Sequence, residues 1–213
     1  MSDSEFVAGL RARASDVGRS ISSSQAVEFE KFYTLLAKWN PRINLTALDL
    51  GPSPARETLD RLFIEPLIAS ELIPNTPIAV IDLGSGAGSP ALPLKVLRPA
   101  IRLTMVETRG RKAAFLREAV RTLRLPNVDV EQTRFQAMPA SMSSEFDVVT
   151  VRALKLDDDL LAAALELLNP DGQLITFGVD LVPGFQMEER RPLPDGSFAA
   201  SWVPTEDALD PDL

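Results

Sequence analysis

The fold is decided by the stretch Ile78-Ala79-Val80-Ile81-Asp82-Leu83-Gly84-Ser85-Gly86-Ala87-Gly88, in which a short apolar run meets three alternating glycines. An apolar run of this length that ends at a glycine is typical of a buried β-strand. Glycine lets the backbone turn tightly and lets a ligand approach where a Cβ atom would collide. A helical pattern follows over residues 89–97 and ends before Pro99. Strand, glycine loop and helix in this order predict a βα unit that binds a ligand at its turn.

The spacing of the glycines separates the candidate ligands. A dinucleotide fingerprint, G-x-G-x-x-G, needs a glycine where this chain has Ser89, and the Gly-Lys-Ser/Thr of a P-loop is missing. An acid followed by G-x-G-x-G resembles the S-adenosylmethionine loop of class I methyltransferases. Glu107 closes the next apolar run, 23 residues after Gly84, where a carboxylate can accept hydrogen bonds from both ribose hydroxyls. The carboxylate of Asp82 could bind the ammonium group of the same cofactor, directly or through water.

Apolar runs and helical stripes continue to alternate after the glycine loop. Further strands are expected at 101–106, 128–130, 146–151 and 173–177, and helices at 112–125 and 158–168. A terminal hairpin over 185–203 would turn at 194–196, and residues 169–172 mark another turn. Strands that alternate with helices over tens of residues predict βαβ units. We therefore expect an α/β fold with a parallel sheet that helices cover on both faces.

The N-terminal third of the chain has a helical pattern. Apolar residues at three- and four-residue spacing predict an amphipathic helix over 25–39, capped from 22–24 and stopped by Pro41. A second helical stretch is expected over 57–72 despite Pro66. We divide the chain into a helical extension (1–76), an S-adenosylmethionine-binding α/β domain (77–204) and an acidic, loose tail (205–213).

The composition excludes several classes of chemistry. The 213 residues contain no Cys and no His, which rules out disulfides, thiolate or imidazole metal ligands, and sites built on a cysteine nucleophile or a Ser-His-Asp triad. Apolar residues make up 45% and charged residues 24%, as in an ordinary globular protein. Because a signal-peptide pattern and a long apolar run are both missing, we expect a cytoplasmic protein that binds no membrane. We also expect no metal site.

Charge is unevenly distributed along the chain, whose net charge is −8. Residues 1–76 carry 8 basic and 10 acidic side chains, residues 77–155 carry 12 and 7, and residues 156–213 carry 2 and 13. The basic middle is either a solvated set of helix faces or a docking surface for an anion. Under the second interpretation Arg117 and Arg121, which share one predicted helix face, would follow the phosphates of a nucleic acid.

These motifs together resemble the RsmG/GidB family of 16S rRNA guanine-N7 methyltransferases, from about residue 25 to 152 and more weakly to 178. The segments that carry the resemblance are Lys38-Trp39-Asn40-Pro41-Arg42-Ile43-Asn44-Leu45-Thr46-Ala47, Arg56 with Asp60, residues 81–88 with Leu92-Pro93-Leu94, Glu107-Thr108-Arg109-Gly110-Arg111-Lys112 with Phe115-Leu116, and Val151-Arg152-Ala153. The pattern Trp-Asn-x-x-x-Asn-Leu-Thr after a helix is fairly specific, whereas the glycine loop alone is not.

The resemblance implies a Rossmann-like, mostly parallel seven-stranded sheet with a helical N-terminal subdomain. It also implies S-adenosylmethionine as methyl donor and 16S rRNA, or a precursor of the small ribosomal subunit, as partner. The implied cofactor contacts are Asp82, Gly84, Ser85, Gly86, Gly88, Glu107, Thr108, Arg134, Phe135 and Arg152. Arg152 is the candidate catalytic residue beside cofactor and acceptor, and Asn44 and Arg56 are expected on the substrate side. Arg109, Arg117 and Arg121 complete the candidate substrate contacts.

The implied reaction suits the composition. Guanine N7 carries a lone pair and no proton, so its attack on a sulfonium methyl group needs no general base. Holding the two reacting atoms in line can supply about 7 to 11 kcal/mol of the barrier. A protein without His and Cys can therefore catalyse this transfer by positioning and electrostatics.

The chain departs from the family pattern at several positions. Glu57 and Arg61 replace a histidine and a serine, Ala87 and Ala91 replace a proline and a glycine, and Phe177 replaces a lysine. Two alternatives stay open beside the rRNA methyltransferase. One is a methyltransferase of the same fold that acts on a small molecule or a protein, and the other is a catalytically silent relative that binds S-adenosylmethionine.

Overall fold

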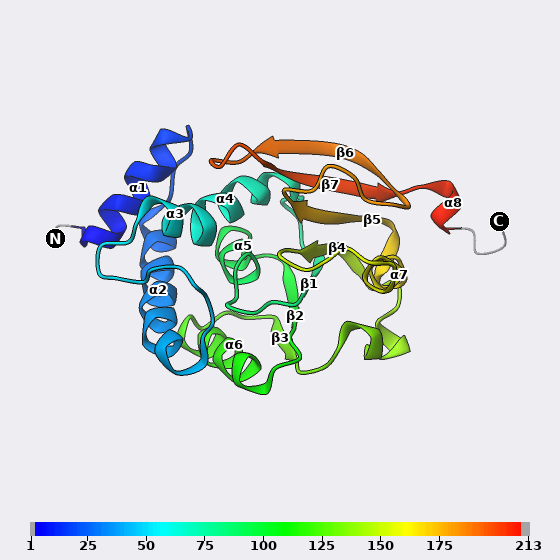
Figure 1. The fold of residues 1–213 in the computed structure, drawn as a ribbon, viewed down its shortest axis with the longest axis horizontal. Helices are drawn as coiled ribbons and strands as arrows, with labels where there is room; N and C mark the ends of the chain where they lie inside the picture. Colours follow the sequence, from blue (N-terminus) through cyan, green and yellow to red (C-terminus); the bar gives the residue numbers. More distant parts are fainter. Residues whose placement is uncertain (1–2, 210–213) are drawn as a thin grey trace.

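The structure is a computed structural model that describes residues 3–209. At its centre lies a seven-stranded sheet with the order β3-β2-β1-β4-β5-β7-β6 (Figure 1). The strands are β1 (Ala79–Leu83), β2 (Arg102–Val106), β3 (Val128–Glu131), β4 (Phe146–Val151), β5 (Leu168–Phe177), β6 (Phe185–Pro192) and β7 (Phe198–Pro204). The first five strands pair in parallel, and β7 runs antiparallel to both of its neighbours. The predicted α/β fold with a mostly parallel seven-stranded sheet is confirmed.

Helices cover both faces of this sheet. They are α1 (Glu5–Asp16), α2 (Ser23–Ile43), α3 (Arg56–Leu59), α4 (Glu65–Ala69), α5 (Ala91–Leu97), α6 (Gly110–Thr122), α7 (Asp158–Leu167) and α8 (Glu206–Leu209). The N-terminal helices pack with α5 and α6 on one face, and α7 packs on the other. In β1, Val80 contributes to the first core and Ile81 to the second, because successive side chains of a strand point to opposite faces.

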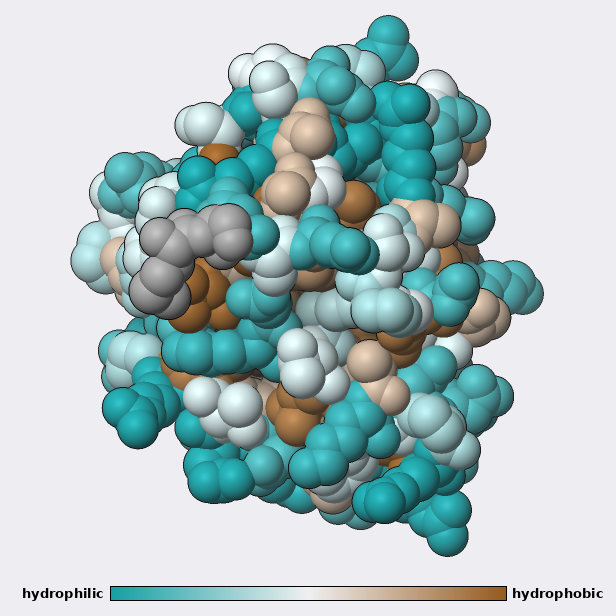
Figure 2. All heavy atoms as spheres, turned by 90° about the vertical axis from the view of Figure 1, so that its left-hand side faces the viewer, coloured by the Kyte–Doolittle hydropathy of each residue, from teal (hydrophilic) through white to brown (hydrophobic). Residues whose placement is uncertain are grey.

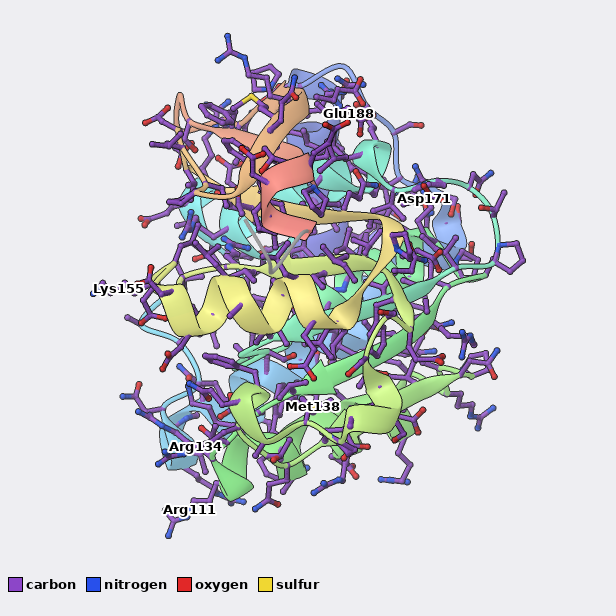
Figure 3. All side chains as sticks on the ribbon, turned by 90° about the vertical axis from the view of Figure 1, so that its right-hand side faces the viewer. Arg111, Arg134, Met138, Lys155, Asp171 and Glu188 are labelled. Atoms are coloured by element: carbon purple, nitrogen blue, oxygen red, sulfur yellow. The ribbon has the colours of Figure 1, made fainter. Side chains whose placement is uncertain are left out.

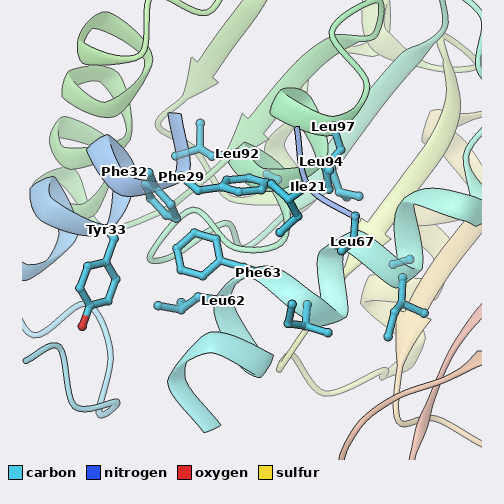
Figure 4. Packing of buried hydrophobic residues seen from close by; sticks show 14 of the residues in the cluster. Ile21, Phe29, Phe32, Tyr33, Leu62, Phe63, Leu67, Leu92, Leu94 and Leu97 are labelled. Atoms are coloured by element: carbon cyan, nitrogen blue, oxygen red, sulfur yellow. The ribbon is translucent and has the colours of Figure 1, made fainter. Parts of the chain in front are cut away.

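The core on the N-terminal side is centred on Phe63, which lies between α3 and α4 and is fully buried. Figure 4 shows its ring beside Phe29 and Phe32 of α2. The ring centroids of these two residues lie 5.2 and 6.0 Å from that of Phe63, which is the usual spacing of stabilising aromatic pairs. The outer face of the N-terminal helices is mostly hydrophilic, with hydrophobic side chains only in small groups (Figure 2). The helical extension therefore shares one hydrophobic core with the sheet.

Helix α2 extends beyond its predicted end. It continues through Pro41 to Ile43, so the predicted stop at Pro41 is wrong. The side chain of Asn40 explains the difference, because its amide oxygen accepts hydrogen bonds from the backbone N–H groups of Leu45 and Thr46, at 2.8 and 2.9 Å. These bonds hold the chain that leaves the helix and stabilise the last turn despite the proline.

The second helical stretch is present but irregular. A π-helical turn, Asp60–Ile64, separates α3 from α4, and a 3₁₀ turn, Ser70–Leu72, ends the stretch. The N–H of Glu65 donates to the carbonyl oxygen of Asp60, five residues earlier. Pro66 follows in the first turn of α4, where a helix does not need its missing N–H. A π-helical turn within an α-helical stretch, such as Asp60–Ile64, is frequent at functional sites.

The C-terminal part differs from expectation in two places. The turn predicted at 169–172 lies inside β5, where the pairing with β4 shifts between Phe146 and Val148. Residues 206–209 of the expected loose tail form α8, which follows a hydrogen bond from the N–H of Thr205 to the carbonyl of Gly184. The rest of the tail lies outside the described residues. Within residues 3–209, none of the helices combines the length and hydropathy that a membrane span requires.

Candidate functional site

Two adjoining cavities open at the carboxyl ends of β1, β2 and β4. One, the loop cavity, has a volume of about 500 Å³ and lies against the glycine loop, the end of β2 and the start of α6. The other, the adjoining cavity, has a volume of about 440 Å³ and lies between residues 45–49 and the segment 55–62. Both are lined by Leu45, Ala87, Ser89 and Arg152. Ligands of open α/β sheets bind in crevices at this end of the strands.

The glycine loop presents bare backbone to the loop cavity. The N–H groups of Gly84 and Ser85 both donate to the carbonyl of Val106, at 2.9 and 3.0 Å, which folds the loop over the end of β2. Gly86 has a φ of +52°, and a Cβ atom there would meet only the carbonyl of Gly84, at 3.6 Å. Glycine adopts this conformation without steric cost. A ligand can therefore approach the backbone closely at Gly86.

Glu107 supports the loop from the end of β2 and is 6% exposed. Its Oε2 atom accepts the N–H of Gly86 at 3.0 Å, and Oε1 accepts the N–H of Arg109 at 2.7 Å. The hydroxyl of Thr108 makes a longer contact of 3.4 Å with Oε1. An ionised carboxylate offers about four acceptor positions, so the two short bonds leave capacity for a pair of hydroxyl groups in the loop cavity.

Asp82 belongs to β1, two positions before Gly84 of the loop cavity, and does not itself line that cavity. It is 1% exposed, and its Oδ1 atom accepts the hydroxyl of Thr150 at 2.5 Å. Burial raises the pKa of this carboxyl group, and Ser85 and Thr150 oppose the rise. Among the described residues, nothing donates to Oδ2. A buried acceptor without a hydrogen-bond partner is energetically costly. A ligand or water molecule that donates a hydrogen bond to Oδ2 would remove this cost.

Arg152 lies where the two cavities meet, and its guanidinium group is held from several directions. Its Nη2 atom lies 2.8 Å from Oε2 of Glu65, and its Nη1 atom donates to the carbonyl of Arg61 at 2.6 Å. The hydroxyl of Ser89 lies 3.3 Å from Nη1, and the ring centroid of Phe177 lies 5.3 Å from Cζ. These contacts fix the orientation of the side chain.

The ion pair between Glu65 and Arg152 is buried. Glu65 is 0% exposed and the side chain of Arg152 is 9% exposed. Burial raises the pKa of Glu65 and lowers that of Arg152, while the attraction between them opposes both shifts. Arg61 adds a second cation, 3.3 Å from Glu65, with a side chain that is 40% exposed at the wall of the adjoining cavity. The positive charge of Arg152 is therefore balanced within the protein.

Most of the predicted cofactor residues line the loop cavity, namely Gly84, Ser85, Gly86, Glu107, Thr108, Phe135 and Arg152. Gly88 faces the core instead, since a Cβ atom there would lie 2.6 Å from Cδ1 of Leu92. The side chain of Arg134 is exposed and projects at the same edge as Arg111 (Figure 3). The neighbours Thr133 and Phe135 line the cavity. The roles of all these residues stay predictions.

The predicted substrate residues are more scattered. Arg109 lines the loop cavity. Asn44 ends α2 in a left-handed conformation, directly before Leu45, which lines both cavities. The side chain of Arg56 lies 3.1 Å from the carboxylate of Asp16 and outside the cavity walls.

Arg117 and Arg121 lie on the outer surface of α6, away from both cavities. The guanidinium of Arg117 donates to the carbonyl of Val130 at 3.1 Å, and that of Arg121 pairs with Glu118 at 2.6 Å. The exposed pair of Arg121 with Glu118 contributes little to stability, so an RNA phosphate could replace Glu118 as the partner of Arg121. The predicted RNA contacts of these two arginines stay predictions.

Sequence reasoning missed Glu65, Thr46 and Leu154. Glu65 lies in a helical stretch far from Arg152 in the sequence, and no local pattern pairs them. Thr46 lines the adjoining cavity and belongs to the Asn44-Leu45-Thr46 motif, so the motif could have identified it as a site residue. Leu154 packs over Gly84, where a Cβ atom would lie 2.7 Å from its Cδ1 atom. Within residues 3–209, no group of three or more acidic, His or Cys residues is placed to hold a metal ion.

Comparison with known sequences gives a consistent result. The family model for rRNA small subunit methyltransferase G (GidB) matches residues 25–178. The ribosomal RNA small subunit methyltransferase G of Xanthomonas oryzae pv. oryzae (strain KACC10331 / KXO85) is 35% identical over 180 residues, which cover 84% of this chain and 78% of the relative. The protein of the same name from Chloroflexus aggregans (strain MD-66 / DSM 9485) is 36% identical over 74% of this chain and 66% of its own length.

Solved structures share the fold at low sequence identity. A SAM dependent methyltransferase from Aquifex aeolicus superposes with a TM-score of 0.55 at 16% identity, over 70% of this chain and 96% of its own. The [4+2]-cyclase SpnF superposes with a TM-score of 0.56 at 19% identity, over 82% of this chain and 76% of its own. A methyltransferase and a cyclase thus share this architecture, so the fold alone does not decide the reaction.

Proposed function

This chain belongs to the rRNA small subunit methyltransferase G family, and from that premise we propose that it transfers the methyl group of S-adenosylmethionine to N7 of a guanine in 16S rRNA. The observation that carries the proposal is the carboxylate of Glu107, which lies 3.0 Å from the N–H of Gly86 in a cavity at the carboxyl ends of the strands. Membership of the family supports the reaction, and the geometry of the loop cavity supports binding of the cofactor there.

The residues of the loop cavity fit S-adenosylmethionine. The remaining acceptor positions of Glu107 suit the two ribose hydroxyls, and Gly86 admits close contact with the backbone. The unpartnered Oδ2 atom of Asp82 suits the ammonium group, directly or through water. Phe135 offers an apolar face for the adenine. When bound, the cofactor supplies an electrophilic methyl group on a positively charged sulfur atom.

The adjoining cavity is the place for the acceptor base, because it meets the loop cavity at Ser89 and Arg152. A nucleobase there can direct one ring nitrogen across the junction. Buried Leu45 and half-buried Ala87 limit access of water at the junction. Guanine N7 needs no base to remove a proton, so the chain can act without His or Cys by orienting the two partners.

The charge distribution supports an RNA partner. Arg111, Arg134 and Lys155 project along one side of the molecule, whereas Asp171 and Glu188 lie toward the other (Figure 3). Arg109 and Lys112 continue the basic side into the wall of the loop cavity. Asp171 and Glu188 therefore need not face RNA phosphates, whereas the acidic run 157–159 closely follows Lys155 on the basic side. A protein that contacts phosphates in this way binds more weakly as the salt concentration rises.

Methyl transfer to unmethylated small-subunit RNA tests the proposal. Labelled S-adenosylmethionine, the full chain and either 16S rRNA or small subunits are combined at several salt concentrations. The modified position is then mapped by borohydride and aniline cleavage, which acts at 7-methylguanosine. We expect one cleavage site and a rate that falls with salt. Transfer that persists after nuclease treatment would favour a protein or small-molecule acceptor, and cofactor binding without transfer would indicate a catalytically silent relative.

A further inference from the structure

The adjoining cavity holds one polar side chain that the protein itself does not use. Its polar lining residues are Thr46, Asp49, Glu57, Thr58, Arg61, Ser89 and Arg152. Glu57 is exposed on the first turn of α3, and no residue among 3–209 forms a hydrogen bond or an ion pair with its carboxylate. An unpaired carboxylate in the wall of a cavity is available to a ligand.

The other polar side chains of this wall are already engaged. Thr46 and Asp49 accept backbone N–H groups, from Leu48 and Gly51 respectively. Thr58 and Ser89 donate to backbone carbonyls, of Asp49 and Leu62 respectively. Arg61 and Arg152 both contact Glu65. Glu57 also lines the adjoining cavity without lining the loop cavity. It therefore belongs to the part of the wall that the two cavities do not share.

The chemistry of guanine matches this position. N7 lies on one edge of the base, and the N1–H and 2-amino donors lie on the Watson–Crick edge, which is the other side of the ring system. A guanine that directs N7 across the junction can present those two donors to the unshared part of the wall, which includes Glu57. A carboxylate accepts both donors at once, whereas the unprotonated N1 of adenine would repel it.

The reaction also moves charge toward Glu57. The N7 lone pair forms the new carbon–nitrogen bond, the electron pair of the broken sulfur–carbon bond stays on sulfur, and no proton is released. The positive charge therefore passes from the sulfur atom to the guanine ring. Arg152 and Arg61 both line this cavity, but Glu65 lies 2.8 Å from Arg152 and Asp195 lies 4.0 Å from Arg61, so each cation has an anion beside it. An anion beside the base is stabilising chiefly in the transition state, where the charge develops.

We propose that Glu57 recognises the N1–H and 2-amino edge of the acceptor guanine and stabilises the positive charge that the base gains as N7 is methylated. The inference rests on the proposed guanine-N7 methylation. It assigns base specificity to a side chain of α3 rather than to the glycine loop or to the arginines of α6.

Exchange of guanosine for inosine at the acceptor tests the proposal, because inosine lacks the 2-amino group. After the acceptor has been mapped with the wild-type protein, ligated RNAs carry either nucleoside at that position. Inosine keeps N1–H, so the exchange removes one hydrogen bond to a charged group, which is worth about a 10- to 150-fold discrimination. We expect kcat/KM of the wild type to fall by this factor on inosine RNA. The Glu57→Ala variant should lose most of that preference, and Glu57→Gln should be intermediate.

Glu188→Gln is the matched control, because Glu188 is also exposed and lies away from the edge that carries Arg111 and Arg134 (Figure 3). It should keep the guanosine preference of the wild type. Equilibrium binding of the two RNAs without cofactor provides a second measurement and should show the same loss of preference in Glu57→Ala. Melting temperatures close to that of the wild type would show that the variants fold.

The possible failures are distinguishable. If wild-type protein methylates guanine N7 but Glu57→Ala keeps the full preference for guanosine over inosine, the role of Glu57 is refuted and the proposed function stands. If wild-type protein forms no 7-methylguanosine in any small-subunit RNA, the proposed function fails, and the role of Glu57 fails with it.

Discussion

Removal of the carboxylate of Glu65 should destabilise the protein severely. The perturbation is Glu65→Ala, which leaves the guanidinium of Arg152 in a site where its side chain is only 9% exposed. Loss of one partner from a buried ion pair costs about 3–5 kcal/mol. For a domain of this size each kcal/mol lowers Tm by about 2–4 °C, so we expect a decrease of about 6–20 °C. Arg61 adds little to the cost, because water can solvate its partly exposed side chain.

Urea denaturation at pH 7.5 measures this cost, with circular dichroism as the readout. A second variant, Glu65→Leu combined with Arg152→Met, removes both charges and should recover most of the lost free energy of unfolding. Because Arg152 lies at the junction of the cavities, we expect this stable double variant to have lost methyl transfer. A loss below about 1 kcal/mol in Glu65→Ala, or a double variant no more stable than the single one, would refute a buried and mutually dependent pair.

Three further predictions follow from the loop and its surroundings. Glu107→Gln should weaken S-adenosylhomocysteine binding by about 10- to 150-fold, the equivalent of one charge-assisted hydrogen bond; an unchanged Kd in calorimetry would contradict this. Burial raises the pKa of Asp82 above 3.8, so the wild type loses stability as pH rises through that raised pKa. Asp82→Asn should therefore be more stable by about 1–3 kcal/mol at pH 7, with the advantage disappearing in urea melts below pH 3.8. Gly88→Ala should cost about 1–3 kcal/mol in urea melts, because the new Cβ would lie 2.6 Å from Leu92; equal stability would show that the core yields at no cost.

The sheet was largely predictable from the sequence, because buried parallel strands leave short apolar runs. The run over 146–151 coincides with β4, and the runs over 78–83 and 101–106 coincide with β1 and β2 to within one residue. The end of α2 was less predictable. Pro41 signals a helix end, whereas the bonds of Asn40 that extend the helix depend on how the following chain folds back.

The candidate site was predictable where chemistry and local spacing coincide. Glu107 and Gly86 are joined by a hydrogen bond of 3.0 Å, as the order of strand, glycine loop and strand suggested. The partnership of Glu65 with Arg152 joins residues 87 positions apart and leaves no periodic trace in one sequence. The sequence could not distinguish Gly88 from Gly84 and Gly86, because the three glycines are evenly spaced. Only the structure shows that Gly88 faces the core rather than the cavity.

The most direct test of the account is the chemical identity of the methylated nucleoside. The full chain is incubated with methyl-labelled S-adenosylmethionine and unmethylated small-subunit RNA, the RNA is digested completely, and the nucleosides are separated by mass spectrometry. We expect the label in 7-methylguanosine alone, with close to one label per RNA molecule. Label in any other nucleoside, or an RNA that stays unlabelled while the protein binds the cofactor, would contradict it.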